Sequence, residues 1–338
     1  MNNFILIFIA NYSLHMYNMG VIIKIVYIYI GGVAMKRILD TIIENNRHWT
    51  SKGTVASYIP ELAKADPNIL GICVTTLDGR EYHSGDYDTK FTLQSISKVI
   101  TLMLAILNNG TEYVFSKVGM EPTEFSFNSI TNLESRPQKK PLNPMINAGA
   151  IATSSLISGK NSEEKFNNIL NFTRKICENN LIDVNNEVYK SEKATGDRNR
   201  ALAYYMKSNG IIEGDVDEIL DVYFKACSIE VTCKDIARIG AMLANEGVLM
   251  NQERVISREA CRIIKTIMVT CGMYDESGNF AVHIGIPAKS GVGGGIMAAV
   301  PRRMGIGVVG PALDAKGNSI GGIRVLENLS KELDLSIF

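Results

Sequence analysis

The chain has no net charge, no internal repeat and no apolar run long enough to cross a membrane. Its 35 basic and 35 acidic side chains cancel over 338 residues, so no overall field attracts nucleic acid or an anionic lipid surface. Its 29 glycines and nine prolines follow no period, which excludes a collagen-like or low-complexity protein. Hydrophobic residues make up 46% of the chain, enough for a large core. We therefore expect a soluble globular protein with no nucleic-acid partner.

Clustered cysteines and histidines are also missing. The six cysteines form no C-x-x-C pair, and the four histidines lie far apart with no H-x-x-x-H spacing. These patterns argue against a zinc site, and a chain this long does not need disulfides to fold. We expect the thiols to be small core residues in a reducing, cytoplasmic compartment, with no metal. The cysteines are Cys73, Cys177, Cys227, Cys233, Cys261 and Cys271.

Charge is scarce in residues 1–34, which carry only Lys24, whereas Met35 opens a segment of ordinary charge density. Two apolar patches, 4–10 (FILIFIA) and 21–30 (VIIKIVYIYI), fall short of the roughly 18 residues that span a bilayer. No clear cleavage site or preceding positive charge indicates a signal peptide. We interpret 1–34 as an atypical extension before a true start at Met35. The alternative is a peripheral membrane-anchoring segment.

Apolar periodicity predicts strands near both ends of the chain. Residues 69–76 (ILGICVTT) form a β-branched run that ends in a Leu-Asp-Gly turn and resumes near Glu81, which is typical of a hairpin. Short apolar runs at 284–286, 296–300 and 305–309 predict further strands near 282–312. A closing helix is expected over 323–333.

Helical spacing dominates the rest of the sequence. It predicts helices over 35–47 and 55–65, then a strongly apolar helix over 95–107. The middle of the chain carries six more predicted helices: 147–158, 162–179, 199–208, 215–226, 232–245 and 257–270. The separated strand blocks favour an α+β fold, in which one antiparallel sheet assembles from both ends of domain 35–338 and is flanked by helices. The helical subdomain would be an insertion over about 110–270.

The strongest chemical signal is an S-x-x-K motif formed by Ser95 and Lys98. On a helix these positions share one face, so the lysine can reach the serine hydroxyl. A buried lysine with a lowered pKa can accept the serine proton, which activates the serine as a nucleophile. A second copy at 162–165 opens a polar helix, where Ser162 is better interpreted as a helix cap. The alternative for Ser95 is likewise a cap followed by a surface lysine.

Two further stretches carry groups suited to a binding pocket. Residues 289–291 form a K-[S/T]-G triplet at the start of an expected strand, as at the edge of penicillin-recognising active sites. The alternative for this triplet is a flexible turn between strands. Residues 191–199 place Glu192 and Asn199 on either side of a bend, where a carboxylate can face an ammonium group. The alternative is a charged capping loop.

Together these stretches resemble the serine-dependent glutaminases, which have a β-lactamase-like fold. Seven motifs appear in family order: 58–64 (YIPELAK), 91–98 (FTLQSISK), 143–150 (NPMINAGA), 192–199 (EKATGDRN), 227–233 (CSIEVTC), 271–275 (CGMYD) and 287–292 (PAKSGV). The resemblance covers essentially residues 35–338. It implies hydrolysis of L-glutamine to L-glutamate and ammonia through a glutamyl ester, without a metal or organic cofactor.

The resemblance also implies a role for each matching residue. Ser95 matches the nucleophile, Lys98 the base beside it, and Tyr274 a proton shuttle between nucleophile and leaving ammonia. The amides of Ser95 and Val292 would form the oxyanion hole. The residues expected to hold the α-amino and α-carboxylate groups are Asn147, Glu192, Asn199 and Tyr223, with Glu192 facing the ammonium. Tyr58 matches a tyrosine that lines the pocket.

The family further implies a homo-oligomer, either a dimer or a tetramer, and no membrane partner is expected. Two other functions share part of this pattern. A penicillin-recognising hydrolase or transpeptidase would share S-x-x-K and K-[S/T]-G, but it leaves the Glu192–Asn199 cluster unexplained. A non-catalytic ligand sensor could use the same pocket without turnover. An assay of ammonia release from glutamine separates these three functions.

Overall fold

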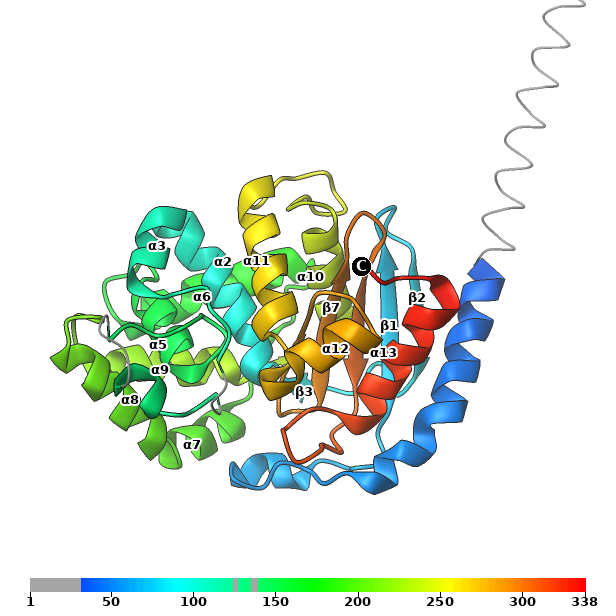
Figure 1. Ribbon diagram of the computed structural model, residues 1–338, viewed down its shortest axis with the longest axis horizontal. Coiled ribbons are helices and arrows are strands. Elements are labelled where there is room, and N and C mark those ends of the chain that lie inside the picture. The colour runs from blue at the N-terminus through cyan, green and yellow to red at the C-terminus, as the bar shows by residue number, and fades with distance from the viewer. Residues whose placement is uncertain (1–31, 124–126, 135–138) are drawn as a thin grey trace, which may run out of the picture.

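The computed structural model describes residues 32–123, 127–134 and 139–338. The predicted extension at 1–34 therefore lies outside the described residues up to residue 31. Figure 1 shows two sides to the molecule, a sheet covered by helices and a cluster made almost entirely of helices. No helix in the described ranges is both long and apolar enough to cross a membrane.

The main sheet has five antiparallel strands in the order β2-β1-β8-β7-β6. Their bounds are β1 Gly71–Thr76, β2 Glu81–Gly85, β6 Ala288–Ser290, β7 Gly295–Val300 and β8 Met304–Val309. Strand β1 pairs with β8 across more than two hundred intervening residues, with Cys73 opposite Gly307. The predicted antiparallel sheet built from both ends of the chain is thus confirmed.

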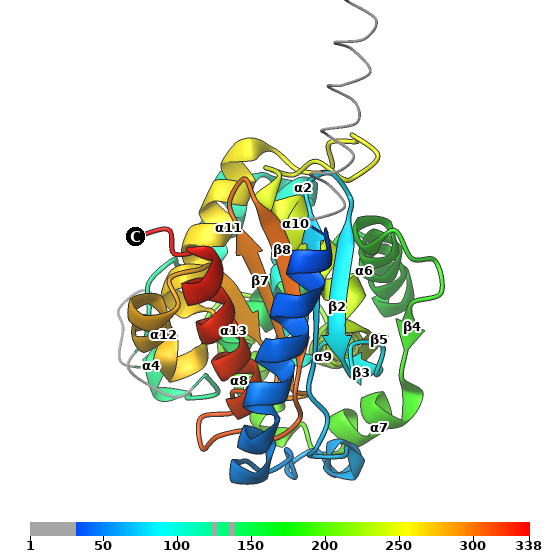
Figure 2. The ribbon, with the colours of Figure 1, turned by 90° about the vertical axis from the view of Figure 1, so that its right-hand side faces the viewer.

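Both faces of the sheet are buried at β1, β7 and β8, which explains why these three strands are mostly apolar. On β1, Ile72 and Val74 join one core cluster, and Cys73 between them joins the other. The first cluster is covered by the helix at 32–46 and by α13 (Ile320–Leu333), which lie side by side in Figure 2. The opposite face is covered by α10 (Cys233–Ala244).

Glycine allows α10 to lie unusually close to the sheet. A Cβ on Gly240 would stand 2.2 Å from the Ala298 carbonyl oxygen, and one on Gly305 would stand 2.0 Å from the Ala237 carbonyl oxygen. No real side chain tolerates such contacts, so either substitution must push the helix off the strands. Because α10 is a central core element, this displacement should lower stability.

We expect Gly240→Ala to lower the melting temperature by several degrees, since overpacking a core typically costs about 1–3 kcal/mol. A matched control is Gly278→Ala, another helical glycine, whose added Cβ would have no heavy atom within 4 Å. The control should leave the melting temperature unchanged or raise it slightly. Equal effects of the two substitutions in a thermal melt would contradict the close-packing argument.

The helical side contains most of the predicted helices and a small second sheet. The helices are α2 Ser97–Asn109, α3 Thr111–Lys117, α4 Thr131–Glu134, α5 Asn147–Ser155, α6 Ser162–Cys177, α7 Asn186–Ala194, α8 Asp197–Ser208, α9 Val216–Cys227 and α11 Arg258–Cys271. The second sheet has the order β3-β5-β4, with β3 Phe91–Thr92, β4 Asp183–Val184 and β5 Ile229–Val231. Although α10 falls inside the range 110–270, it packs on the main sheet. The extent of the insertion stays a prediction.

Three local predictions were wrong. Residues 284–286 form a turn rather than a strand, because Gly285 has a left-handed φ of 71°, although both flanking isoleucines are buried. Residues 55–65 contain only the short 3-10 helix η2 (Pro60–Lys64). The cap of α6 is Asn161, whose side chain accepts from the Glu164 amide, so Ser162 is the first helical residue.

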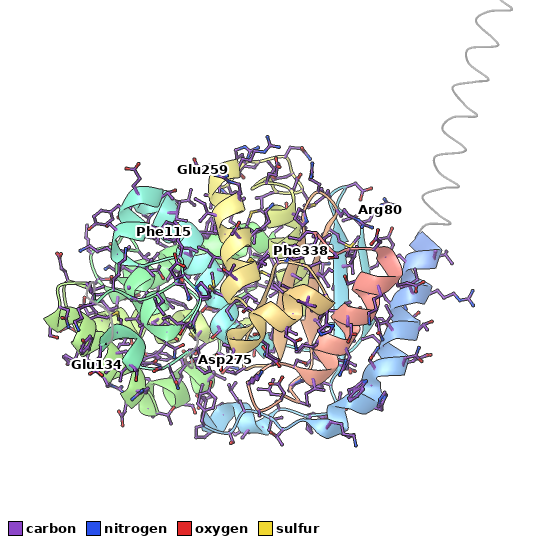
Figure 3. The ribbon with its side chains drawn as sticks, viewed as in Figure 1. Arg80, Phe115, Glu134, Glu259, Asp275 and Phe338 are labelled. Atoms are coloured by element: carbon purple, nitrogen blue, oxygen red, sulfur yellow. The ribbon has the colours of Figure 1, made fainter. Side chains whose placement is uncertain are left out.

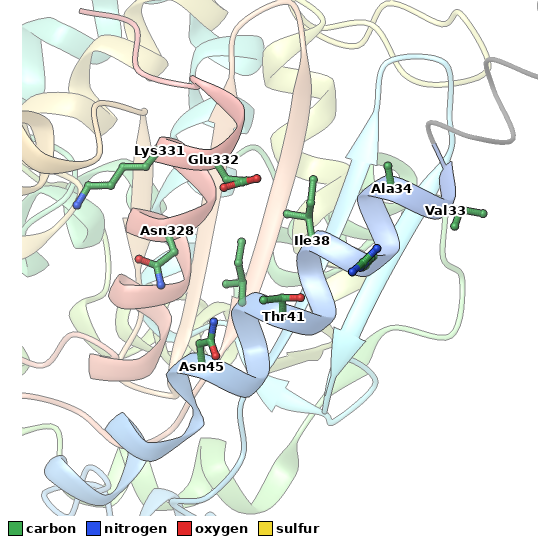
Figure 4. A pocket seen from close by; sticks show the side chains of 10 residues that line it. Val33, Ala34, Ile38, Thr41, Asn45, Asn328, Lys331 and Glu332 are labelled. Atoms are coloured by element: carbon green, nitrogen blue, oxygen red, sulfur yellow. The ribbon is translucent and has the colours of Figure 1, made fainter.

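A groove of about 860 Å³ lies between the helix at 32–46 and α13 (Figure 4). Its lining includes Val33, Ala34 and Ile38 from the first helix and Asn328 and Glu332 from α13. None of the residues predicted to carry chemistry lies there. Size alone therefore does not identify the active site.

Candidate active site

Ser95 occupies a tight turn between the two sides of the molecule. It lies on the 3-10 helix η3 (Gln94–Ile96), directly before α2, rather than in the first turn of the α-helix as the sequence predicted. Gln94 has a left-handed φ of 46°, which turns the chain sharply from β3 into α2. The Leu93 amide donates to the Ile229 carbonyl at 2.8 Å and so anchors the turn to β5.

Lys98 is fully buried, so the alternative of a surface lysine is wrong. Its Nζ donates to the Asn147 Oδ1 at 2.7 Å and to the Met145 carbonyl at 3.1 Å. Both acceptors are neutral, so no direct ion pair compensates the buried charge. Burial lowers the pKa of Lys98 to about 8, with a smaller opposing effect from Glu192. A lysine with this pKa can serve as a base near neutral pH.

Tyr274 lies on the 3-10 helix η4 (Tyr274–Glu276) with its hydroxyl buried. Burial raises its pKa to about 12, and the nearby Ser95 and Ser290 hydroxyls oppose this rise. Neither contact has full hydrogen-bond geometry, so in the described part of the chain Tyr274 Oη and Ser290 Oγ have no hydrogen bond. Buried polar atoms without partners beside Ser95 are available to a ligand.

The K-[S/T]-G triplet forms the wall beside this tyrosine. Lys289 lies on β6, is fully buried, and places its Nζ 4.3 Å from the centre of the Tyr274 ring. It also donates to the Gly272 carbonyl at 2.9 Å and to the Ser290 carbonyl at 2.7 Å. Lys289 and Ser290 therefore end a buried strand, and Gly291 follows it, so the triplet lies at the end of a strand rather than at its start or in a flexible turn.

The glycine that ends the triplet and Gly293 beyond it let the chain approach the Ser95 turn. A Cβ on Gly291 would stand 2.6 Å from the Leu93 carbonyl oxygen and 3.4 Å from the Ser95 nitrogen. Within the described ranges, the amides of Ser95 and Val292 both lack a hydrogen-bond acceptor. Two free N–H groups beside one hydroxyl can stabilise the oxyanion that develops on a carbonyl oxygen when that hydroxyl attacks the carbonyl carbon.

Glu192 comes from α7, not from a loop, and its side chain is buried. Gln94 Nε2 donates to its carboxylate at 3.4 Å, and the Cys227 thiol also stabilises the ionised form. Burial outweighs these contacts and raises the pKa of Glu192 to about 8. An incoming ammonium group would restore the charge on this carboxylate and bind to it.

Two asparagines connect Lys98 to the opposite side of the pocket. Asn147, at the start of α5, accepts from Lys98 and donates through Nδ2 to Asn199 Oδ1 at 2.9 Å. Asn199 lies in the first turn of α8, so Asn147 links the start of this helix to Lys98. The structure thus brings together residues that the sequence separates by about fifty positions.

A cavity of about 100 Å³ lies at this junction. Seven of the predicted residues line it: Tyr58, Ser95, Asn147, Glu192, Asn199, Tyr223 and Val292. Tyr223 is buried, whereas Tyr58 is 57% exposed and stands at the rim. Lys98 and Tyr274 lie just behind the wall and contact lining residues Asn147 and Ser95, respectively.

Sequence reasoning gave no role to the other eight lining residues, among them Gln94, Phe127 and Cys227. Gln94 and Cys227 belong to motifs that carried the family resemblance, so their positions beside Ser95 and Tyr223 were the available signal. Phe127 gave no such signal. Its ring centre lies 4.9 Å from that of Tyr274, a contact between segments far apart in sequence. Within the described residues, no group of three potential ligands could hold a metal ion.

Comparisons with known proteins give one consistent result. The family model for glutaminase matches residues 53–338. A glutaminase of Clostridium botulinum (strain Kyoto / Type A2) is 70% identical over 305 residues, which cover 90% of this chain and all of that protein. Glutaminase 2 of Clostridium perfringens (strain 13 / Type A) is also 70% identical over 305 residues, with the same coverage of both chains.

Solved structures agree with these sequence matches. A Bacillus glutaminase crystallised in 4.3 M NaCl has 42% identity and a TM-score of 0.83, covering 89% of this chain and 98% of its own. A Bacillus subtilis glutaminase in covalent complex with 5-oxo-L-norleucine, formed from 6-diazo-5-oxo-L-norleucine, has 39% identity and a TM-score of 0.82. The match covers 91% of this chain and the whole of the Bacillus subtilis chain. The similarity therefore extends over both sides of the molecule.

Proposed function

Because this chain belongs to the glutaminase family, we propose that it hydrolyses L-glutamine to L-glutamate and ammonia through a glutamyl ester on Ser95. The observation that carries this mechanism is the convergence of Ser95, the fully buried Lys98 and the unpartnered Tyr274 hydroxyl at one cavity. The same cavity contains a buried carboxylate that suits an amino acid.

In acylation, neutral Lys98 takes the Ser95 proton as Oγ attacks the side-chain carbonyl carbon of glutamine. The free amides of Ser95 and Val292 stabilise the tetrahedral oxyanion. Tyr274, which lies against Ser95, delivers a proton to the departing amide nitrogen, and the proton that Lys98 took from Ser95 then restores the tyrosine hydroxyl. The C–N bond breaks, ammonia leaves, and a glutamyl ester remains on Ser95.

In deacylation, water attacks the ester carbonyl from the side that ammonia vacated. The proton of this water passes to neutral Lys98, which returns it to the Ser95 oxygen as glutamate leaves. The two steps balance because one water is consumed, and one ammonia and one glutamate are released. No redox partner is needed.

Recognition of the α-amino acid end rests on the polar wall opposite Ser95. Glu192 faces the α-ammonium, and Asn147, Asn199 and Tyr223 complete the contacts to the α-amino and α-carboxylate groups. Tyr58 closes the rim. Neutral overall charge is consistent with this recognition, because a zwitterion responds to local charges rather than to a net field.

We expect Glu192→Gln to raise KM by about 10–100-fold and to change kcat far less. The substitution removes the charge that pairs with the substrate ammonium, and a charged hydrogen bond contributes about 1.5–3 kcal/mol. The matched control is Glu187→Gln on the same helix, whose side chain is 67% exposed and paired with Lys190. Steady-state kinetics that show a normal KM for the Glu192 variant would refute the ammonium contact.

The activity itself is tested by ammonia release from L-glutamine, with nitrocefin hydrolysis and equilibrium binding measured in parallel. Glutamine turnover without nitrocefin hydrolysis supports the proposal. Binding without turnover would indicate the ligand sensor instead.

We further propose that the protein is cytoplasmic and forms a homo-oligomer, either a dimer or a tetramer. Mass photometry of the purified protein would test the oligomeric state.

A further inference from the structure

The backbone of Tyr274 adopts a conformation that tyrosine rarely takes. Its φ is 51°, in the left-handed region where a Cβ crowds the following carbonyl. A residue in this region keeps its conformation only when surrounding contacts fix it. The direction of the Tyr274 ring, and hence the position of its hydroxyl beside Ser95, depends on those contacts.

One set of contacts is local to the chain segment. The Met273 amide donates to Ser277 Oγ at 3.0 Å, and that hydroxyl donates to the Tyr274 carbonyl at 3.1 Å. The Glu276 amide closes the turn on the Met273 carbonyl at 3.0 Å. These bonds shape η4 but do not connect it to the rest of the molecule.

The connection is made by a turn at 314–318, after β8. Asn318 is fully buried, and its Nδ2 donates to Glu276 Oε2 at 3.2 Å and to the Met273 carbonyl at 3.4 Å. Lys316 Nζ reaches the other carboxylate oxygen of Glu276 at 3.2 Å. The Glu276 carboxylate therefore bridges η4 to two residues of this turn, and its side chain is only 20% exposed.

The turn also lies against the tyrosine ring. Gly317 has a φ of 90°, and a Cβ on it would stand 3.7 Å from Tyr274 Cε2 and 3.4 Å from Val292 Cγ1. The Asp314 carboxylate accepts from the amides of Lys316 and Asn318 and so fixes the shape of the turn. Figure 3 shows Asp275, the central residue of η4, near the boundary between the two sides of the molecule.

We propose that Glu276 is a positioning residue for the reaction. By binding Asn318 and Lys316, it fastens η4 to the 314–318 turn and holds the Tyr274 hydroxyl beside Ser95. Glu276 does not line the cavity. The inference rests on the proposed role of Tyr274 as the proton shuttle, and it adds the structural reason why that hydroxyl stays in place.

Glu276→Ala should lower kcat by about 10–100-fold and change KM less than about twofold, because proton transfer is sensitive to small displacements while substrate recognition is not affected. Glu276→Gln should recover most of the activity, since its amide oxygen can still accept from Asn318.

A matched control is Glu327→Ala on α13, which also removes a bridging carboxylate. This carboxylate is 16% exposed and binds Arg324 at 2.7 Å and Lys331 at 2.6 Å. The control should leave kcat unchanged. A wild-type kcat for Glu276→Ala, or an equal loss for both alanine variants, would overturn the proposal.

A double-mutant cycle with Tyr274→Phe separates positioning from a general loss of structure. If Glu276 acts through the tyrosine hydroxyl, Glu276→Ala should have almost no further effect on kcat in the Tyr274→Phe background. The same fold-loss in both backgrounds would overturn the proposal. A near-normal kcat for Tyr274→Phe alone would instead show that the proton-shuttle role is wrong, while an impaired Tyr274→Phe with a fully active Glu276→Ala would exclude only the positioning role.

Discussion

Replacing Ser95 with alanine should abolish steady glutamine hydrolysis, lowering kcat by at least about 10⁴-fold while the protein remains folded. Without Ser95 Oγ no glutamyl ester can form. Lys98 then has no serine proton to accept, and Tyr274 has no leaving group to protonate. The polar wall around Glu192 is untouched, so glutamine should still bind. Ammonia release under saturating glutamine measures the loss, and calorimetric titration measures the retained binding.

Ser154→Ala is a matched control for this substitution. Ser154 is also fully buried, and its hydroxyl donates to the Ala150 carbonyl at 2.8 Å, but it lies outside the cavity. This variant should lose some stability and keep its kcat. Treatment with 6-diazo-5-oxo-L-norleucine should add mass to the wild-type protein and the control but not to the Ser95 variant. Steady activity in the Ser95 variant would sink the acyl-enzyme mechanism.

The sequence could predict this nucleophile because its signal is local. Ser95 and Lys98 are three residues apart, directly before a run of apolar residues long enough to bury the lysine. Likewise, the β-branched run in β1 and the short apolar runs of β7 and β8 predicted three strands of the main sheet, because a strand buried on both faces must be apolar almost throughout. These features depend on residues that neighbour one another in the chain.

Other parts of the site could not be predicted because they depend on distant contacts. The helix α7, which carries Glu192, is rich in charged residues and buries few of its side chains, so it looked like a capping loop. The left-handed conformations of Gln94 and Tyr274 have no signature in the identity of either residue. They are fixed by β5 and by the 314–318 turn, which pack against them only in the folded protein.

The second large effect is expected for Lys98. Lys98→Ala should lower kcat by about 10²–10⁴-fold, the usual contribution of a general base, with a much smaller change in KM. Lys98→Arg should be nearly as impaired. A guanidinium can still donate toward Met145 and Asn147, but it stays protonated and cannot accept the Ser95 proton. This pair of variants distinguishes a base from a residue that only fills space and donates hydrogen bonds.

Lys265→Arg provides the control for replacing a buried lysine. Lys265 is half-buried on α11, and burial lowers its pKa as well, yet it lies outside the cavity. Its replacement should leave kcat and KM close to the wild-type values. If Lys98→Arg were also fully active, the ammonium group of Lys98 would have a structural role, and another group would have to accept the Ser95 proton.

The pH dependence of the wild-type enzyme should report the same base. Only the neutral amine can take a proton, and burial places the pKa of Lys98 at about 8. The kcat should therefore rise about tenfold per pH unit below that value and level off above it.

The pKa of the free Glu192 is also raised to about 8, and its ionised form binds the substrate ammonium. The ratio kcat/KM should therefore rise more steeply than kcat, because it reports both groups in the free enzyme. In Glu192→Gln the two profiles should have the same slope. A kcat that stays flat from about pH 6 to 9 would mean that Lys98 is not the base, since its protonation would then leave the rate unchanged.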